Sequence, residues 1–278
     1  MSTSGASIDA AVSGLAVRFV GLDGPLRATL EKEWAPFLGG AGDPFLTVEV
    51  SAADHTIVTD RAMRPSVAGE VRDGCGSFRS DEGDLTVDSA GLARIRLGTG
   101  DERWRYWGLM NLFAAATAVR MPSRPGALVH AAGIVVDGRA FLLIGPEGAG
   151  KSTFARMAGS GGAQVISDDA VLVDGAGGGL FLLGSPIRAH EATRPGPGRW
   201  PVAAILHAQR GAPSRLRAVD RLTAEAVVTA NLPFVVTGWG RDARLEPLVT
   251  YLSESVPHRR LTFAPDPSFV GVLRLAAF

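Results

Sequence analysis

Cysteine and lysine are both scarce in this 278-residue chain. The single cysteine, Cys75, excludes an intramolecular disulfide and a zinc site built from several cysteines. Lys32 and Lys151 are the two lysines among 28 basic residues, so arginine carries nearly all of the positive charge. The formal net charge is zero, which leaves no overall field to attract nucleic acid or an anionic membrane surface. We therefore expect neither as a partner.

Long apolar runs and targeting signals are also missing. No stretch of about 18 uncharged apolar residues occurs, so we expect no membrane-spanning helix. The opening MSTSGASIDAAVSG has neither the basic start nor the apolar core of a secretory signal, and we interpret residues 1–14 as a flexible lead. The hydrophobic fraction of 46% and the charged fraction of 20% are typical of a globular protein, which we expect to be cytoplasmic.

One of the two lysines lies in a glycine-rich loop, GPEGAGKST, that fully matches the Walker A pattern G-x-x-x-x-G-K-[ST]. Glycines let successive backbone N–H groups point at a phosphate chain, at the positive end of the following helix. Lys151 would reach the outer phosphates as a compact charge, and the Ser152 hydroxyl would bind Mg²⁺. The predicted nucleotide-binding residues are Gly145, Pro146, Glu147, Gly148, Ala149, Gly150, Lys151, Ser152 and Thr153.

The pattern of the chain changes at residues 121–126, where Pro and Gly interrupt an amphipathic helix expected over 101–120. We place a domain boundary there, between a mixed α/β N-terminal domain (1–122) and a P-loop catalytic domain (123–278). The fold class is α/β, or α+β for the chain as a whole. In the first domain we expect strands at 15–20, 45–50, 85–87 and 93–97, and a helix at 25–38.

After the boundary, apolar segments at 127–136 and 139–144 predict two strands joined by a tight turn at Asp137-Gly138. The phosphate loop, a short helix over 151–158 and a strand over 164–166 follow. Further strands are expected at 170–173, 180–183, 201–208 and 260–263, and helices near 223–230, 245–256 and 267–276.

Two adjacent carboxylates, Asp168 and Asp169, follow the strand at 164–166. Ligands gather at the carboxyl ends of strands in open α/β sheets. One carboxylate can hold magnesium while the other accepts a proton from an attacking hydroxyl, although such a pair alone could also cap a turn. His130 could approach these carboxylates if the strands are neighbours, whereas a lone histidine in an apolar run is more often a core residue. The remaining histidines share no metal-ligand spacing.

Together these features resemble the catalytic domain of the bacterial HPr kinase/phosphorylase family, in its divergent HPr-kinase-related branch. The resemblance covers residues 127–173 well, continues weakly through 201–208 and through LTFAPDPSFVGVL near the end, and does not cover 1–120. It implies a P-loop kinase core of the HPr-kinase type that uses ATP (or another nucleoside triphosphate) and Mg²⁺. The implied activity is that of a phosphotransferase with an alcohol group as acceptor.

The resemblance also implies roles for matched positions. Lys151 and the loop amides would bind phosphates, Ser152 and Asp168 would lie at the metal, and Asp169 would be the base toward a serine-type hydroxyl. Asp168 would pair with His130, and which aspartate is base and which is metal ligand stays open. Divergent members include kinases of ribosomal precursor peptides of the lasso type and kinases of small hydroxylated metabolites. A peptide, a protein or a small molecule could thus be the acceptor.

This chain departs from the family pattern at three places. Ala131 follows His130 where the family usually has glycine, and Gly184–Arg188 is the segment nearest to the family's second glycine-rich signature. Glu191 is the acidic residue nearest to the expected downstream metal ligand. These departures argue against HPr as the substrate and against reverse phosphorolysis, and whether the reverse reaction occurs stays open.

Other readings of the phosphate loop remain. A GTPase is disfavoured because no N-K-x-D sequence occurs, and a transport-type ATPase because no L-S-G-G-Q-like sequence occurs. A non-catalytic nucleotide-binding module is disfavoured because Lys151, Ser152 and both aspartates are all present. Residues 1–122 carry no catalytic motif, and acceptor recognition or self-association into a homo-oligomer are the two roles left open for them.

Overall fold

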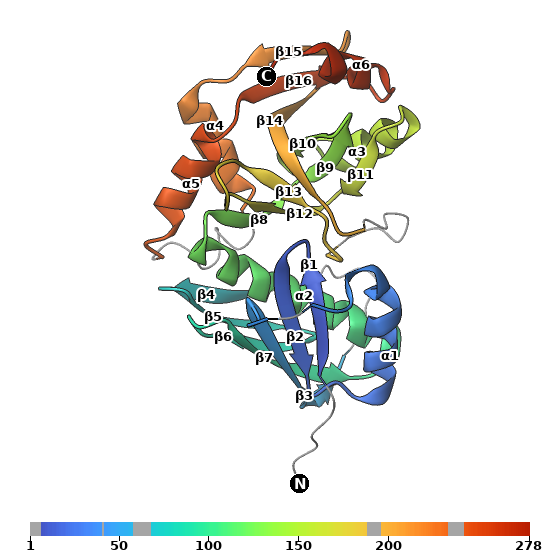
Figure 1. Ribbon diagram of the computed structural model, residues 1–278, viewed down its shortest axis with the longest axis vertical. Coiled ribbons are helices and arrows are strands. Elements are labelled where there is room, and N and C mark those ends of the chain that lie inside the picture. The colour runs from blue at the N-terminus through green and yellow to red at the C-terminus, as the bar shows by residue number, and fades with distance from the viewer. Residues whose placement is uncertain (1–6, 41, 58–67, 188–195, 233–241) are drawn as a thin grey trace. The chain divides into compact units, whose positions relative to one another are not determined.

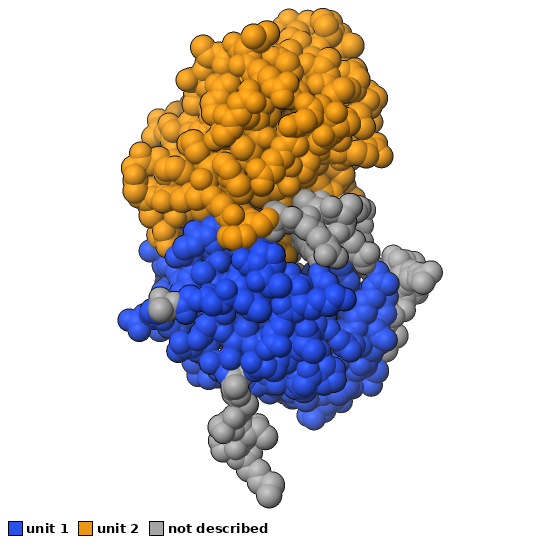
Figure 2. All heavy atoms as spheres, turned by 45° about the vertical axis from the view of Figure 1, so that its right-hand side comes forward, with its two compact units in different colours: residues 1–123, 234–244 blue, residues 124–233, 245–278 orange. Residues whose placement is uncertain are grey.

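The computed structural model describes residues 7–40, 42–57, 68–187, 196–232 and 242–278. The chain divides into two compact units, unit 1 with residues 1–123 and 234–244 and unit 2 with residues 124–233 and 245–278 (Figure 2). We expected all residues from 123 onward in one domain, whereas 234–244 groups with unit 1. Each unit is mixed α/β and has its own mixed sheet (Figure 1). No helix within the described ranges is long and apolar enough to span a membrane.

Unit 1 is built on a sheet with the strand order β1-β2-β3-β7-β6-β5-β4. Helix α1 (Gly24–Glu33) connects β2 to its parallel neighbour β3, and α2 (Glu102–Arg120) follows β7. Short 3₁₀ turns follow the two helices, at Ala35–Phe37 and Met121–Ser123. The strands are β1 (Ile8–Val12), β2 (Leu15–Val20), β3 (Leu46–Thr56), β4 (Ala68–Arg72), β5 (Cys75–Ser80), β6 (Gly83–Val87) and β7 (Leu92–Thr99).

The core of unit 1 forms between α2 and one face of this sheet. Helix α2 begins where the Asp101 carboxylate accepts a hydrogen bond from the Arg103 N–H at 3.0 Å, which satisfies one unpaired donor of the first turn. Phe113 of α2 meets Trp34 and Phe19 edge-on or tilted, with ring centroids 5.2 and 5.6 Å apart. Such arrangements are the preferred geometry for buried aromatic rings.

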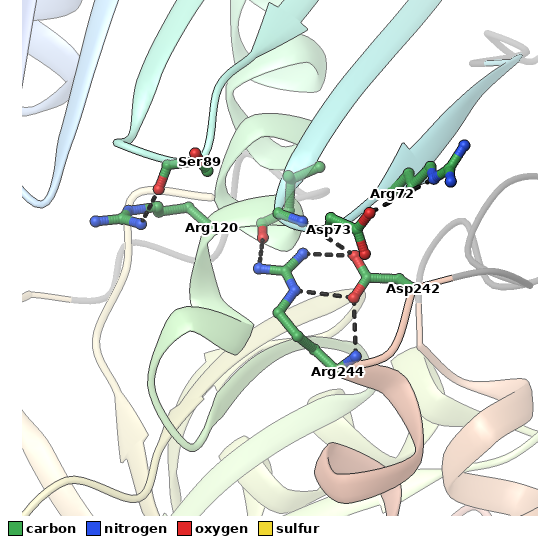
Figure 3. Close-up of polar contacts among 8 residues, drawn as sticks. Arg72, Asp73, Ser89, Arg120, Asp242 and Arg244 are labelled. Atoms are coloured by element: carbon green, nitrogen blue, oxygen red, sulfur yellow. Dashed lines mark hydrogen bonds and ion pairs between the residues drawn. The ribbon is translucent and has the colours of Figure 1, made fainter.

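Asp242 and Arg244 lie at the end of the segment 234–244, and their hydrogen bonds connect this end to the rest of unit 1 (Figure 3). The Arg244 guanidinium donates to the Asp242 carboxylate at 2.7 and 2.9 Å and to the Val119 carbonyl oxygen at 3.2 Å. Asp242 also accepts from the Gly74 N–H at 3.4 Å. Burial alone would raise the pKa of Asp242, but the hydrogen bonds from Arg244 lower it. These contacts explain why residues far along the sequence belong to unit 1.

Unit 2 contains a mixed sheet with the order β11-β9-β10-β14-β13-β12-β8, extended by β16 beside β14 and β15 beside β16. β10, β14 and β16 are parallel neighbours, whereas β9 is antiparallel to both β10 and β11. The strands are β8 (Gly126–His130), β9 (Ala132–Val136), β10 (Arg139–Ile144), β11 (Gln164–Ser167), β12 (Ala170–Asp174), β13 (Phe181–Leu183), β14 (Arg199–Arg210), β15 (Arg215–Ala218) and β16 (His258–Phe263).

Helices α3 (Lys151–Ser160) and α6 (Ser268–Leu275) share one apolar cluster with β9, β10, β14 and β16. Phe154 of α3 and Phe269 of α6 are fully buried and stack with ring centroids 4.7 Å apart. Helices α4 (Arg221–Ala230) and α5 (Leu245–Glu254) contact each other. Phe154 therefore anchors the helix that follows the glycine-rich loop, which gives the loop a rigid base.

Most expected elements are confirmed, but the strand pairing adds several that local patterns did not indicate. β1 lies in the expected flexible lead, and β4, β5 and β15 lie where we expected no strands. The expected strand over 127–136 is two strands, because β8 pairs with β12 while β9 pairs with β10 and β11. The turn at Asp137-Gly138 is confirmed, with φ of 49° and 77°.

Two histidines that share no sequence motif form a buried pair in unit 2. His207 Nε2 lies 2.9 Å from His258 Nδ1, and His258 Nε2 lies 3.2 Å from the Leu252 carbonyl oxygen. A carbonyl only accepts, so His258 carries its proton on Nε2 and His207 donates to the bare Nδ1. The described residues contain no group of three metal-ligating side chains, and this pair is a core hydrogen bond.

This pair makes the stability of the protein depend on pH. Burial lowers the pKa of His207 from 6.5 to about 4. The unfolded chain therefore takes up a proton near pH 6.5 that the folded protein does not accept until about pH 4. The contribution of His207 to the free energy of unfolding is therefore fully present above about pH 6.5. It is lost as the pH falls from 6.5 toward 4, by a few kcal/mol in total. Urea unfolding at pH 7.5 and 5.5 should show the loss. The His207→Phe variant should show a smaller pH dependence, and an unchanged dependence would contradict this explanation.

Candidate active site

The start of β9 brings three segments of unit 2 together. β10 and β11 both run antiparallel to β9, so they point the same way and end at the same edge of the sheet. Leu143 of β10 pairs with Ala132, and Ser167 of β11 pairs with Gly133. The glycine-rich loop follows β10 and the two aspartates follow β11. Both therefore lie beside the point where the chain passes from His130 into β9.

The loop between β10 and α3 has the backbone that its glycines permit. Gly148 and Gly150 have φ of 74° and 104°, a region that is strained for residues with a Cβ atom. Gly150 caps α3, and the Phe154 N–H donates to its carbonyl oxygen at 2.8 Å. The first turn of α3 therefore presents backbone N–H groups toward the loop, an arrangement that favours anions.

Lys151, the first residue of α3, is only 7% exposed and folds back onto the loop. Its ammonium donates to the carbonyl oxygens of Gly145 at 2.8 Å and of Pro146 at 3.2 Å. Burial lowers the pKa of Lys151, while the carboxylates of Asp169 and Glu147 act in the opposite direction. The ammonium is thus held inside the loop, within electrostatic range of the second aspartate.

His130 and Asp169 form an ion pair when the imidazole is protonated, with His130 Nδ1 and Asp169 Oδ1 3.1 Å apart. The register of β8 and β12 explains the contact, because His130 pairs with Ala170 and the Ala131 N–H donates to the Asp169 carbonyl oxygen at 3.0 Å. The family resemblance implied that His130 pairs with Asp168. The structure pairs it with Asp169, so that expectation is corrected. Both side chains are about half exposed to solvent.

The other predicted metal-site residues differ in exposure. Asp168 is buried, whereas Ser152 is exposed in the first turn of α3. A carboxylate and a hydroxyl are hard oxygen donors of the type that magnesium uses together with substrate phosphates and water. The donor chemistry therefore fits Mg²⁺ held jointly by protein and nucleotide. Glu191 and Arg188, which the sequence analysis placed nearest to the missing family signatures, lie outside the described residues.

Asn231 connects the glycine-rich loop with His130 at the end of β8, and no sequence motif indicated this role. Its Oδ1 accepts from the Gly145 N–H at 3.2 Å, and its backbone oxygen accepts from the His130 N–H at 2.7 Å. Its Nδ2 donates to the Val227 carbonyl oxygen at 2.8 Å, which fixes the amide orientation at the end of α4. Asn231 is 3% exposed and holds two segments of the site in register.

Comparisons with known proteins do not show which family the chain belongs to. No protein-family model and no curated protein matches the chain. Among solved structures, the chain is similar to the "Hpr(Ser) kinase/phosphatase from Coxiella burnetii", with 13% sequence identity and a TM-score of 0.28. The match covers 53% of this chain and 96% of that chain. A similarity of this extent does not assign an activity to the chain.

Proposed function

We propose that this protein is an ATP-dependent kinase that transfers a phosphoryl group to a serine/threonine-type hydroxyl of a peptide, a protein or a small molecule. The observation that carries the proposal is the convergence of a lysine-containing phosphate loop and a histidine-paired carboxylate at one edge of the unit 2 sheet. Phosphoryl transfer needs both parts, because charge on the phosphates must be stabilised while the attacking hydroxyl loses its proton. The sequence resemblance over 127–173 supports the same assignment.

In the proposed reaction, the loop amides and Lys151 bind the phosphates of ATP. Lys151 turns from the carbonyl oxygens of Gly145 and Pro146 toward the β- and γ-phosphates. Asp169 accepts the proton of the acceptor hydroxyl as the new oxygen–phosphorus bond forms, and the bond between the γ-phosphorus and the bridging oxygen breaks to release ADP. His130 orients the Asp169 carboxylate toward the hydroxyl through its Nδ1.

Magnesium would be held by Ser152 and Asp168 together with the phosphate oxygens, where it would neutralise negative charge on the triphosphate. Asp168 is buried next to Asp169 in the sequence, so the two neighbouring carboxylates can take different roles. The buried carboxylate, Asp168, is suited to bind the cation. The half-exposed one can reach an acceptor that enters from solvent.

The proposal is tested by incubating the full chain with ATP, Mg²⁺ and panels of hydroxyl-bearing peptides and small molecules. The expected result is an acceptor whose mass increases by one phosphoryl group, with one ADP formed for each transfer. ADP formed without a phosphorylated acceptor would support the ATPase alternative. Nucleotide binding without any turnover would support a non-catalytic module and overturn the kinase assignment.

A further inference from the structure

A cavity of about 440 Å³ opens beside the phosphate loop in unit 2. Three of its lining residues, Ala149, Gly150 and Thr153, come from the end of the loop and the first turn of α3. The others come from the carboxyl ends of two parallel strands and the residues after them, at 210–212 on β14 and 263–265 on β16. Ligands of open α/β sheets bind outside the carboxyl ends of parallel strands, and roughly 300–1,000 Å³ is the usual volume of a small-molecule site.

The cavity continues from the phosphate site on the side away from the aspartates. β14 and β16 lie on one side of β10, whereas β9 and β11, which leads to Asp168 and Asp169, lie on the other (Figure 1). A triphosphate bound on the loop would therefore have Asp168 and Asp169 on one side and this cavity on the other. The Arg210 guanidinium lines the cavity and donates to the Gly148 carbonyl oxygen, so it connects the two sites.

We infer that this cavity binds the nucleobase and ribose of the nucleotide, an assignment that rests on the proposed function. Its walls are mainly apolar and include Phe263, Ala264 and Pro265. Among the described residues that line it, Thr153 and Arg210 have the polar side chains, and the Arg210 guanidinium already donates to the Gly148 carbonyl oxygen. Sites that discriminate by hydrogen bonding reject the wrong ligand far more strongly than apolar pockets do. The cavity therefore recognises the presence and shape of a base rather than its identity.

Calorimetric titrations of the full chain with ATP, GTP and inorganic tripolyphosphate, each with Mg²⁺, test this inference. Packing of a base against protein groups should make ATP bind about ten- to hundredfold more tightly than tripolyphosphate. ATP and GTP should bind within about tenfold of each other. A preference for one purine well beyond tenfold would overturn the shape-only recognition, and equal affinity for ATP and tripolyphosphate would overturn the nucleobase site.

A cavity-filling substitution separates the contribution of the base to the binding affinity from that of the phosphates. Ala212 is exposed at the cavity, so Ala212→Trp should fill it without disturbing the core and should remove the advantage of ATP over tripolyphosphate. Pro265→Trp, also at an exposed lining position, provides a second variant. Ala218→Trp is the matched control, because Ala218 is exposed at the other end of β15, opposite Arg259, and should bind as the wild type does.

The outcomes separate this inference from the kinase assignment. If both filling variants fold, as judged by thermal melting, and still bind ATP with wild-type affinity, the nucleobase site is overturned while the phosphate site stands. If ATP binds with the expected advantage but no acceptor is phosphorylated, the nucleobase site stands and the kinase assignment fails. If the wild type binds neither ATP nor tripolyphosphate, both are overturned.

Discussion

Replacement of Lys151 by alanine should lower phosphoryl transfer by at least about a hundred- to a thousandfold, because a preorganised charge is removed from the phosphates. Loss of a charge-assisted hydrogen bond should also weaken ATP binding by about ten- to a hundredfold. The protein should remain folded, since burial lowers the pKa of Lys151 and its charged form is therefore not favoured by folding. Steady-state kinetics, calorimetric binding and a melting curve for the same preparation measure all three effects.

Two control variants sharpen this prediction. Lys151→Arg keeps the positive charge, but the wide guanidinium does not fit where the ammonium lies against the Gly145 and Pro146 carbonyl oxygens. We expect it to be nearly as inactive as the alanine variant. Lys32→Ala removes the other lysine, which is exposed on α1, and should retain full activity. Wild-type turnover by Lys151→Ala would contradict a phosphate-binding role and the kinase proposal with it.

Asp169→Asn should lower kcat by about a hundred- to ten-thousandfold, the usual contribution of a general base. The amide keeps the shape of the side chain, and its oxygen can still accept a hydrogen bond from His130, but it cannot take the proton of the acceptor. ATP binding should therefore stay close to that of the wild type. Single-turnover kinetics together with calorimetric binding distinguish the two effects.

The neighbouring residues provide the comparison for Asp169. Asp168→Asn should raise the Mg²⁺ concentration needed for activity, because Asp168 is assigned to the cation rather than to the proton. His130→Ala should reduce turnover without unfolding the protein, since His130 is about half exposed. If Asp169→Asn instead abolished nucleotide binding while Asp168→Asn lost only turnover, the roles of the two aspartates would be exchanged. Unchanged turnover in Asp169→Asn would rule out Asp169 as the base.

Much of the regular structure follows from local patterns. The predicted strands at 15–20 and 139–144 match β2 and β10, and the helix predicted over 101–120 matches α2 with its Asp101 cap. These segments have a clear apolar period and strong turn or capping residues at their ends. β4 and β5 were missed because glycines and charged residues interrupt their sequences. Pairing with neighbouring strands stabilises them, and a local pattern does not contain that information.

The candidate site likewise contains some features that follow from local sequence and one that depends on strand pairing. The glycine-rich loop and the aspartate pair each occupy a short contiguous segment, so residue spacing was enough to nominate them. The contact of His130 with Asp169 depends on the pairing of Ala170 with His130. A shift by one residue in that register would point the side chains to the other face of the sheet. For this reason the sequence could nominate His130 but could not choose its partner.

The sequence by itself determined the glycine-rich loop with Lys151, the segment that carries Asp168 and Asp169, and most of the helices and strands around them. Those features depend on backbone freedom, capping and hydrophobic period within a few residues of the chain. Only the tertiary structure decided that His130 pairs with Asp169, that Asn231 bridges the loop and β8, and that β14 and β16 end at a cavity beside the loop. Each of these joins segments distant in sequence, and strand order and register, which no local signal encodes, bring such segments together.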